Sequence, residues 1–439
     1  MRLQRPLFGT SLAALMLLAA CGGSASVASS PAASAPPPPS SAAAKPSVAS
    51  AKPKPSAAPS VASAKPAVSA SAKPSAAPKP TATTLPTVAA DTAQVTLTKI
   101  PIPALAGKKS LSADIMEVDQ AAHLLYLTDR ATNGVDIFDI SSFPGKFVKT
   151  IPVPGKGTNG LTIAKNVNKI IVGNNDSTVS IIDIDPKSPK VDTVIATVST
   201  GGKKRADETD YDPNTKKAMV ANSDDNFVSI IDMTTNKIVA KINTTPAGGI
   251  EQPRYNPTDK FMYLTGSENN IMYQFDMIKD TMTKQTDVVD KCNPNGNAIN
   301  PTLDIALLGC SNKAQQHTAI WDFKTSKVTS TTDKVGAGDA AIYDAKANKF
   351  FFAASNYYRG GQMGIFSGNG KFIANVPTAV GAHAVAYDET NNALFAQDQL
   401  PNQGAVFTFK VPTGPGGASG AASVSAKPAA GGASAKPSA

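Results

Sequence analysis

The chain of 439 residues has a formal net charge of +9, but the excess positive charge belongs to its ends. Residues 91–411 contain 32 Lys and Arg against 33 Asp and Glu, a net charge of −1, whereas the flanking segments contain ten basic residues and no acidic residue. The middle block therefore lacks the basic surface of a nucleic-acid-binding domain, and we expect no nucleic-acid partner.

Residues 1–20 have the form of a bacterial export signal. Two arginines precede an uncharged apolar run that is too short to cross a bilayer comfortably. The run ends in Leu-Ala-Ala-Cys at 18–21, which resembles a lipobox, the motif whose cysteine becomes the lipidated first residue of the mature protein. The alternative is an ordinary signal peptide followed by an unrelated cysteine. We expect Cys21 to anchor an exported protein to the cell membrane or outer membrane, with its domain facing the periplasm or the exterior.

Two segments have the composition of disordered chain. Residues 22–90 are almost entirely Ala, Ser, Pro and Lys, with Ala-Lys-Pro recurring four times and without an aromatic or acidic residue. Such a segment has nothing to bury that would offset the entropy of ordering it. We expect residues 21–90, lipidated at Cys21, to be a stalk, and residues 412–439, rich in Gly, Ala, Ser, Lys and Pro, to be a disordered tail.

Residues 91–411 repeat a pattern of short strands. In the clearest copy, Phe227–Ile242, an apolar run ends in Asp232, a Thr-Thr-Asn-Lys turn follows, and a second strand alternates apolar and polar residues. Equivalent Asp residues stand 44 to 49 residues apart, at positions 139, 183, 232, 276 and 322. Two weaker copies follow, around 364–366 and 406–409. Four strands in each of seven copies predict an all-β fold, a seven-bladed β-propeller of four-stranded antiparallel blades.

The ends of the repeat block indicate how the ring closes. The last copy lacks a fourth strand, because a Pro- and Gly-rich segment begins at Pro412. A strand-like segment, residues 94–100, precedes the first full copy. We expect it to pair with the last blade, which removes an exposed sheet edge.

The repeats resemble those of a known family. Ser229-Ile-Ile-Asp232 followed by Asn236-Lys-Ile-Val239 is similar to the repeat of YVTN-type β-propellers, which are bacterial secreted and surface proteins. Segments at 205–208, 249–253 and 381–384 also resemble a lactonase-like branch of bacterial propellers. The resemblance implies the propeller fold over 91–411, and it implies little about function because this fold carries scaffolds, sensors and enzymes.

Aligning the seven copies on their first hairpin turn reveals a polar position five residues earlier. Its occupants are spaced 44 to 48 residues apart and form what we call the ring: Asp114, Asn159, Asp207, Glu251, Asn295, Asp339 and His383. Equivalent positions of a closed propeller lie on one circle, here near one mouth of the channel. Four carboxylates, two amides and an imidazole favour Ca²⁺, Mg²⁺ or Mn²⁺, with Zn²⁺ open through His383. The alternative is a channel whose polar groups bind only water.

Cysteines and catalytic motifs narrow the chemistry. With Cys21 assigned to lipid, Cys292 and Cys310 fall nearly opposite one another in a predicted hairpin, and we expect a disulfide between them. Two separate thiols are the alternative. The sequence contains no P-loop, no Gly-x-Ser-x-Gly and no HExxH.

Three functions remain open at this point. The first is a monomeric envelope protein that presents its propeller as a binding or scaffolding module for a protein, glycan or small molecule. The second is a metal-dependent hydrolase of the lactonase kind, since gluconolactonase-type propellers resemble this arrangement in holding a divalent ion in the channel; Asp207 or Glu251 would then act as base. The third is a purely structural role.

Overall fold

The computed structural model describes residues 90–107, 109–288, 291–355, 360–398 and 403–415. These residues all belong to the second of two units, Ala82–Ala439. The predicted signal peptide, Cys21, nearly all of the predicted stalk and the tail beyond 415 lie outside the described residues.

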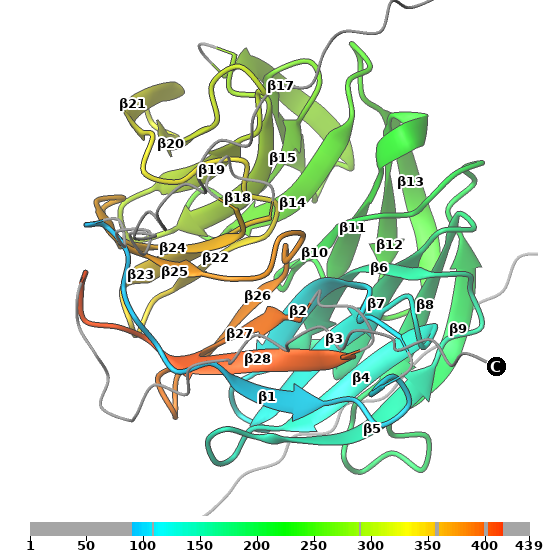
Figure 1. The fold of residues 1–439 in the computed structure, drawn as a ribbon. Helices are drawn as coiled ribbons and strands as arrows, with labels where there is room; N and C mark the ends of the chain where they lie inside the picture. Colours follow the sequence, from blue (N-terminus) through cyan, green and yellow to red (C-terminus); the bar gives the residue numbers. More distant parts are fainter. Residues whose placement is uncertain (1–89, 108, 289–290, 356–359, 399–402, 416–439) are drawn as a thin grey trace, which may run out of the picture. The chain divides into compact units, whose positions relative to one another are not determined.

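The described residues form seven antiparallel sheets of four strands each, which confirms the predicted seven-bladed propeller (Figure 1). In each of the first six blades the chain runs through the four strands in order, from the innermost to the outermost. Each innermost strand contacts those of the two neighbouring blades, including β26 with β2, so the circle is closed.

The strands of blades one to three are β2 (Ala113–Asp119), β3 (Leu124–Asp129), β4 (Gly134–Asp139) and β5 (Lys146–Pro152); β6 (Thr158–Ala164), β7 (Lys169–Asn174), β8 (Thr178–Asp183) and β9 (Thr193–Ser199); and β10 (Thr209–Asp212), β11 (Lys217–Asn222), β12 (Phe227–Asp232) and β13 (Lys237–Asn243). Those of blades four to six are β14 (Ile250–Asn256), β15 (Phe261–Gly266), β16 (Ile271–Asp276) and β17 (Thr281–Asp287); β18 (Pro294–Asn300), β19 (Ile305–Cys310), β20 (His317–Asp322) and β21 (Lys327–Thr332); and β22 (Ala341–Asp344), β23 (Lys349–Ala354), β24 (Gln362–Ser367) and β25 (Phe372–Pro377).

The seventh blade is shared between the two ends of the described chain. It contains β26 (Val385–Asp388), β27 (Ala393–Gln397) and β28 (Ala405–Lys410), with β1 (Thr98–Pro101) as its outermost strand. The pairing of β1 with β28 is antiparallel, with Ile100 opposite Val406. The predicted closure of the ring by an N-terminal strand is therefore confirmed, although the strand covers 98–101 rather than 94–100.

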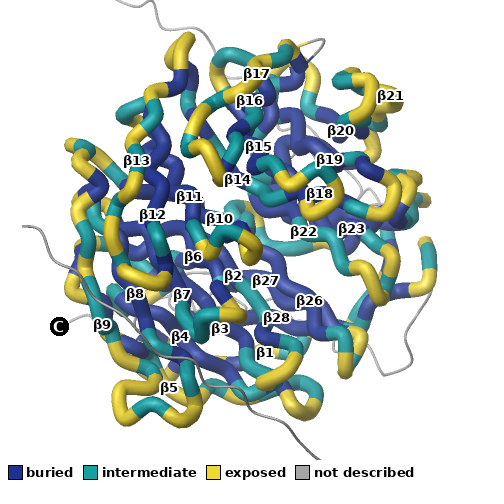
Figure 2. Tube along the Cα trace, turned by 180° about the vertical axis from the view of Figure 1, so that it is seen from behind, coloured by how far each residue is buried: buried dark blue, intermediate teal, exposed yellow. Residues whose placement is uncertain are grey.

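The burial of each strand follows from its place in the blade. The second and third strands lie between neighbouring blades, so both of their faces are covered and their sequences are almost continuously apolar. In β7, Ile170, Ile171 and Val172 are all fully buried. The fourth strand β13 instead alternates exposed and half-buried residues, β17 is mostly exposed, and Figure 2 shows the exposed positions gathered at the rim.

The repeating Asp of the sequence has a structural role at the end of the third strand in blades one to five. Asp232 ends β12, and its Oδ1 accepts the backbone N–H of Thr234 at 2.7 Å. Asp276 ends β16 and accepts that of Ile278 at 2.9 Å, and the aspartates that end β4, β8 and β20 accept turn N–H groups in the same way. A short carboxylate that satisfies turn N–H groups explains why this position repeats.

A disulfide joins Cys292, just before β18, to Cys310, the last residue of β19, as the sequence predicts. Both cysteines are fully buried, in a cluster that includes Trp321. Helical structure in the described chain is limited to two short 3₁₀ turns, η1 (Lys165–Val167) and η2 (Ser223–Asp225), and none of it is long and apolar enough to cross a membrane.

Candidate functional site

The ring residues all lie where an innermost strand begins. Four of them are the second residue of their strand, Asp114 in β2, Asn159 in β6, Glu251 in β14 and Asn295 in β18. The other three, Asp207, Asp339 and His383, precede β10, β22 and β26 by two residues. In the blades of β2, β6, β14 and β18, the regular pairing between the first and second strands is interrupted at the ring residue.

Neighbouring blades touch through their main chains at the level of the ring. The N–H of Gly160 donates to the carbonyl of Asp207 at 3.2 Å, and the N–H of Ala340 donates to that of His383 at 3.1 Å. A Cβ on Gly160 would lie 2.5 Å from the Asp207 carbonyl, so this approach needs glycine. Because the inner strands come this close, side chains of different blades can meet in the channel.

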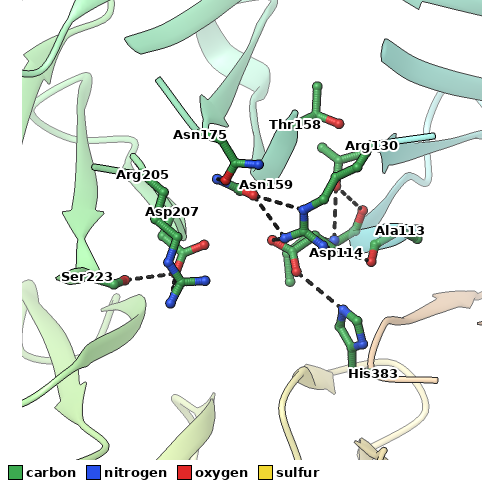
Figure 3. Close-up of polar contacts among 12 residues, drawn as sticks. Ala113, Asp114, Arg130, Thr158, Asn159, Asn175, Arg205, Asp207, Ser223 and His383 are labelled. Atoms are coloured by element: carbon green, nitrogen blue, oxygen red, sulfur yellow. Dashed lines mark hydrogen bonds and ion pairs between the residues drawn. The ribbon is translucent and has the colours of Figure 1, made fainter. Parts of the chain in front are cut away.

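Arg130 joins blades one and two (Figure 3). Its Nη2 lies 2.8 Å from Asp114 Oδ2 and also donates to Asn159 Oδ1 at 2.9 Å. Asn159 in turn donates to the carbonyl of Ala206 in the approach to blade three at 2.9 Å. On the other side, His383 Nε2 of blade seven lies 3.3 Å from Asp114 Oδ1. Both oxygens of the Asp114 carboxylate therefore have cationic partners.

These contacts favour the charged forms of both Asp114 and His383. Burial opposes ionisation of Asp114, but the hydrogen bond from His383 and the charge of Arg130 outweigh it, so the pKa of Asp114 is lowered. Burial also disfavours the imidazolium, but the hydrogen bond to Asp114 and the charges of Asp339 and Asp114 raise the pKa of His383 to about 9. His383 Nδ1 lies 2.7 Å from the carbonyl of Gly381. An imidazolium that donates from both nitrogens does not suit a metal ligand, which favours the oxygen-binding cations over Zn²⁺.

A second arginine pairs with the third blade. Arg205 Nη2 lies 3.1 Å from Asp207 Oδ2, and Ser223 Oγ donates to the same oxygen at 2.8 Å (Figure 3). Burial and the charge of Asp114 nevertheless raise the pKa of Asp207 to about 7. Asp207 thus changes protonation state in the physiological range.

A supporting circle of residues lies behind the ring, at the first position after each second strand. Asn175, Ser223, Ser267 and Ser311 each hydrogen bond to the ring residue sixteen positions earlier in their own blade. Arg130 occupies this position in blade one. Asn295 is held in this way by Ser311, at 3.0 Å. This circle is a second repeat that was not predicted from the sequence, although it follows from the same register as the ring.

Three acidic groups at the ring lack a direct cationic partner among the described residues. Glu208, which the sequence analysis did not identify, is 6% exposed and accepts no hydrogen bond from a described residue. The only hydrogen bond to the Glu251 carboxylate comes from Ser267 at 3.5 Å, and the Asp339 carboxylate accepts none. Burial, with the charges of neighbouring carboxylates, raises the pKa of Glu208 and Glu251; burial also raises that of Asp339.

The donor set fits a hard cation. One oxygen from each of Asp114, Asp207 and Glu208 lies within 4.8 Å of the others. Metal–oxygen bonds of about 2.0–2.6 Å span such a cluster. Five carboxyl groups face three cationic groups, so a divalent cation would balance the formal charge. Arg130, Arg205 and His383 already contact two of the three clustered carboxylates, so Glu208 with Glu251 and Asp339 would provide the additional negative charge.

The ring predicts how stability depends on pH when no cation is bound. The folded state holds protons on Asp207 to about pH 7 and on His383 to about pH 9, whereas the unfolded chain releases them near the ordinary values of 3.8 and 6.5. The folded state therefore binds more protons between about pH 4 and 9, and stability falls as pH rises through this window. With a chelator present, we expect Tm to fall from pH 5 to pH 9 and Asp207→Asn to flatten the part below pH 7. An equal slope in that variant would contradict the assignment.

No family model matches the chain, and no curated protein matches it either. The resemblance to YVTN-type propellers therefore rests on the repeat residues themselves, while the propeller fold rests on the structure.

Proposed function

We propose that the protein is a binding module of the cell envelope, tethered by a lipid on Cys21, and that its ring binds a divalent cation through which ligands are recognised. The observation that carries the proposal is the surplus of acid at the ring. Glu208, Glu251 and Asp339 lie at the same level of the channel, and none of them has a direct cationic partner in the described part of the chain.

Other features support this proposal. Several contacts at the ring join different blades, namely His383 to Asp114, Arg130 to Asn159 and Asn159 to Ala206, so closure of the propeller brings the site together. Export is supported by the buried disulfide, because disulfides form and persist in oxidising compartments.

Elemental analysis of the purified protein tests the cation. After dialysis against metal-free buffer without chelator, we expect near-stoichiometric Ca, Mg or Mn. The triple variant Asp207→Asn/Glu251→Gln/Asp339→Asn should lose it, because three ionisable donors become neutral amides of the same size. The matched control, Asp176→Asn/Glu268→Gln/Asp287→Asn, makes the same chemical changes at exposed sites and should retain the metal.

Two results would overturn the cation proposal. One is a wild-type protein that retains no metal and whose Tm does not change when Ca²⁺, Mg²⁺, Mn²⁺ or Zn²⁺ is added. The other is equal metal content in the wild type and the ring triple variant.

The cluster of Asp114, Asp207 and Glu208 also favours a second candidate, the metal-dependent hydrolase. In that case Asp207 or Glu251 would activate water at the bound cation. A screen of lactones and esters separates the candidates: a hydrolase loses turnover in the ring triple variant, whereas a binding module shows no turnover that depends on the metal.

A further inference from the structure

A second site lies deeper in the channel, where the structure contains a cavity of about 300 Å³. The residue three positions after each ring residue lines it in all seven blades. This second circle consists of Glu117, Thr162, Asp210, Arg254, Ala298, Ile342 and Ala386. Since every blade contributes one of them, the cavity lies on the channel axis, about 10 Å along the inner strands from the ring.

The wall of this cavity is divided into two arcs. Blades one to four contribute polar groups, two carboxylates, a hydroxyl and a guanidinium. Blades five to seven contribute Ala298, Ile342 and Ala386 to the second circle, and Tyr343, Tyr387 and the carboxyl group of Asp344 also line the cavity. A molecule with one charged end and one apolar end would match both arcs.

The two carboxylates are held by main-chain groups of the next blade. Ile163 N–H of β6 donates to Glu117 Oε2 at 3.0 Å, and Tyr255 N–H of β14 donates to Asp210 Oδ2 at 2.5 Å. No described residue hydrogen bonds to the other oxygen of Glu117. Burial, against that backbone hydrogen bond, raises the pKa of Glu117 to about 8, as expected for a carboxyl group that lacks a close cation.

Arg254 is not a close cationic partner of the Glu117 carboxyl group. Its Nη1 donates to the carbonyl of Pro253 at 2.8 Å, and its Nη2 donates to Gln252 Oε1 at 2.9 Å and approaches the carbonyl of Ala341 at 3.5 Å. The guanidinium therefore uses three of its five N–H donors on protein oxygens. Asp344 of blade six also lines the cavity, so three carboxyl groups and one guanidinium give it a formal charge of −2.

Gln252 links the two levels of the channel but keeps them distinct. It is 1% exposed, accepts from Arg254 at the cavity and donates to the carbonyl of Asp339 at the ring at 2.5 Å. None of the ring side chains lines the cavity. Binding in the cavity can therefore be tested separately from binding at the ring.

We propose that this cavity binds a small organic ammonium ion, with the ammonium group between Glu117 and Asp210 and an apolar or aromatic body against Ala298, Ile342 and Ala386. A volume of about 300 Å³ is at the lower end of small-molecule sites and far exceeds a bare metal ion. The formal negative charge of the cavity favours a cation over a neutral molecule or an anion. The apolar arc would leave part of a hydrated metal ion without hydrogen bonds.

Isothermal titration of the purified full-length protein with benzylamine tests this site. Benzyl alcohol has the same shape without the charge, and benzoate has the opposite charge. We expect benzylamine to bind and both others to bind at least about tenfold more weakly, as loss of one buried charge contact predicts. Glu117→Gln and Asp210→Asn should each weaken benzylamine by roughly tenfold or more.

Controls separate the cavity from general electrostatics and from the ring. Asp287→Asn removes an exposed acid at the end of β17, outside the cavity, and should leave benzylamine affinity unchanged. The ring triple variant Asp207→Asn/Glu251→Gln/Asp339→Asn should also bind benzylamine normally, even when it has lost its metal. Ala386→Leu fills part of the apolar arc and should abolish binding.

Several results would overturn the proposal. They are absence of benzylamine binding, equal affinity for benzyl alcohol, or unchanged affinity in Glu117→Gln. Glu117→Gln keeps an oxygen for the Ile163 N–H, so its fold should survive, and a melting curve like that of the wild type confirms this. A loss of benzylamine binding in the ring triple variant alone would assign the amine to the ring instead.

Discussion

Deletion of residues 98–102 from the full chain is expected to abolish soluble, monomeric propeller. These residues include β1, which supplies the fourth strand of the seventh blade. Without it, the N–H and C=O groups of β28 that pair with β1 become an exposed sheet edge. Ile100 and Ile102 are 3% and 0% exposed, so their removal also uncovers the core cluster beneath. Burying each isoleucine contributes about 1.5–3 kcal/mol.

Size-exclusion chromatography and thermal melting would measure this effect. A matched deletion of five residues in the predicted stalk, 60–64, should elute and melt like the wild type. A synthetic peptide of residues 91–103 should restore some monomer to the deleted chain by adding the missing strand. A deleted chain that stays monomeric with an unchanged Tm would show that β1 does not hold the ring closed.

The fold was predictable because the repeating features involve residues that are close to one another in the sequence. Asp232 and its equivalents cap tight turns, and residues between them alternate with the period of strands. These patterns can therefore be recognised without knowledge of tertiary contacts. The exact extent of β1 did not follow, because residues before it serve another blade: Ala93 N–H donates to the carbonyl of Asn375 in β25 at 2.8 Å.

The candidate site was predictable in position but not in charge. Register arithmetic placed the seven ring residues at the start of the inner strands, because equivalent residues in a closed repeat share one level. It did not reveal that Arg130 and Arg205 contact Asp114 and Asp207. Those contacts depend on the directions of long side chains, which a sequence alone does not give. The supporting circle could have been predicted from the sequence, since its residues follow the ring residues by sixteen positions.

The residues of the second circle, which lines the deeper cavity, could also be predicted from the register of the repeats. Counting three residues on from the ring gives Glu117, Thr162, Asp210 and Arg254, all polar and in consecutive blades. The sequence cannot show that space remains between these side chains and the apolar residues opposite. Packing in three dimensions decides whether a polar circle is filled or hollow.

Loss of the disulfide is the second large effect that we expect. The Cys292–Cys310 bond closes a loop with a sequence separation of 18 residues around the first hairpin of blade five. Restricting the unfolded chain in this way stabilises the folded state by about 3 kcal/mol. Cys292→Ala/Cys310→Ala should therefore lower the free energy of unfolding in guanidinium chloride by about that amount, with an additional loss from two buried sulfur atoms.

Reduced wild-type protein provides the control, because it keeps the sulfur atoms and lacks only the bond. If the bond itself matters, reduced wild type and the double alanine variant will both be less stable than the oxidised protein, the variant by somewhat more.

The bond also restrains the segment that enters β18: Asn293, next to Cys292, donates to the carbonyl of Ser267 in blade four at 2.8 Å. Ser267 also contacts Glu251. Reduction should thus weaken cation binding at the ring as well as stability, whereas unchanged unfolding and metal content after complete reduction would show that the hairpin and the ring hold without the bond.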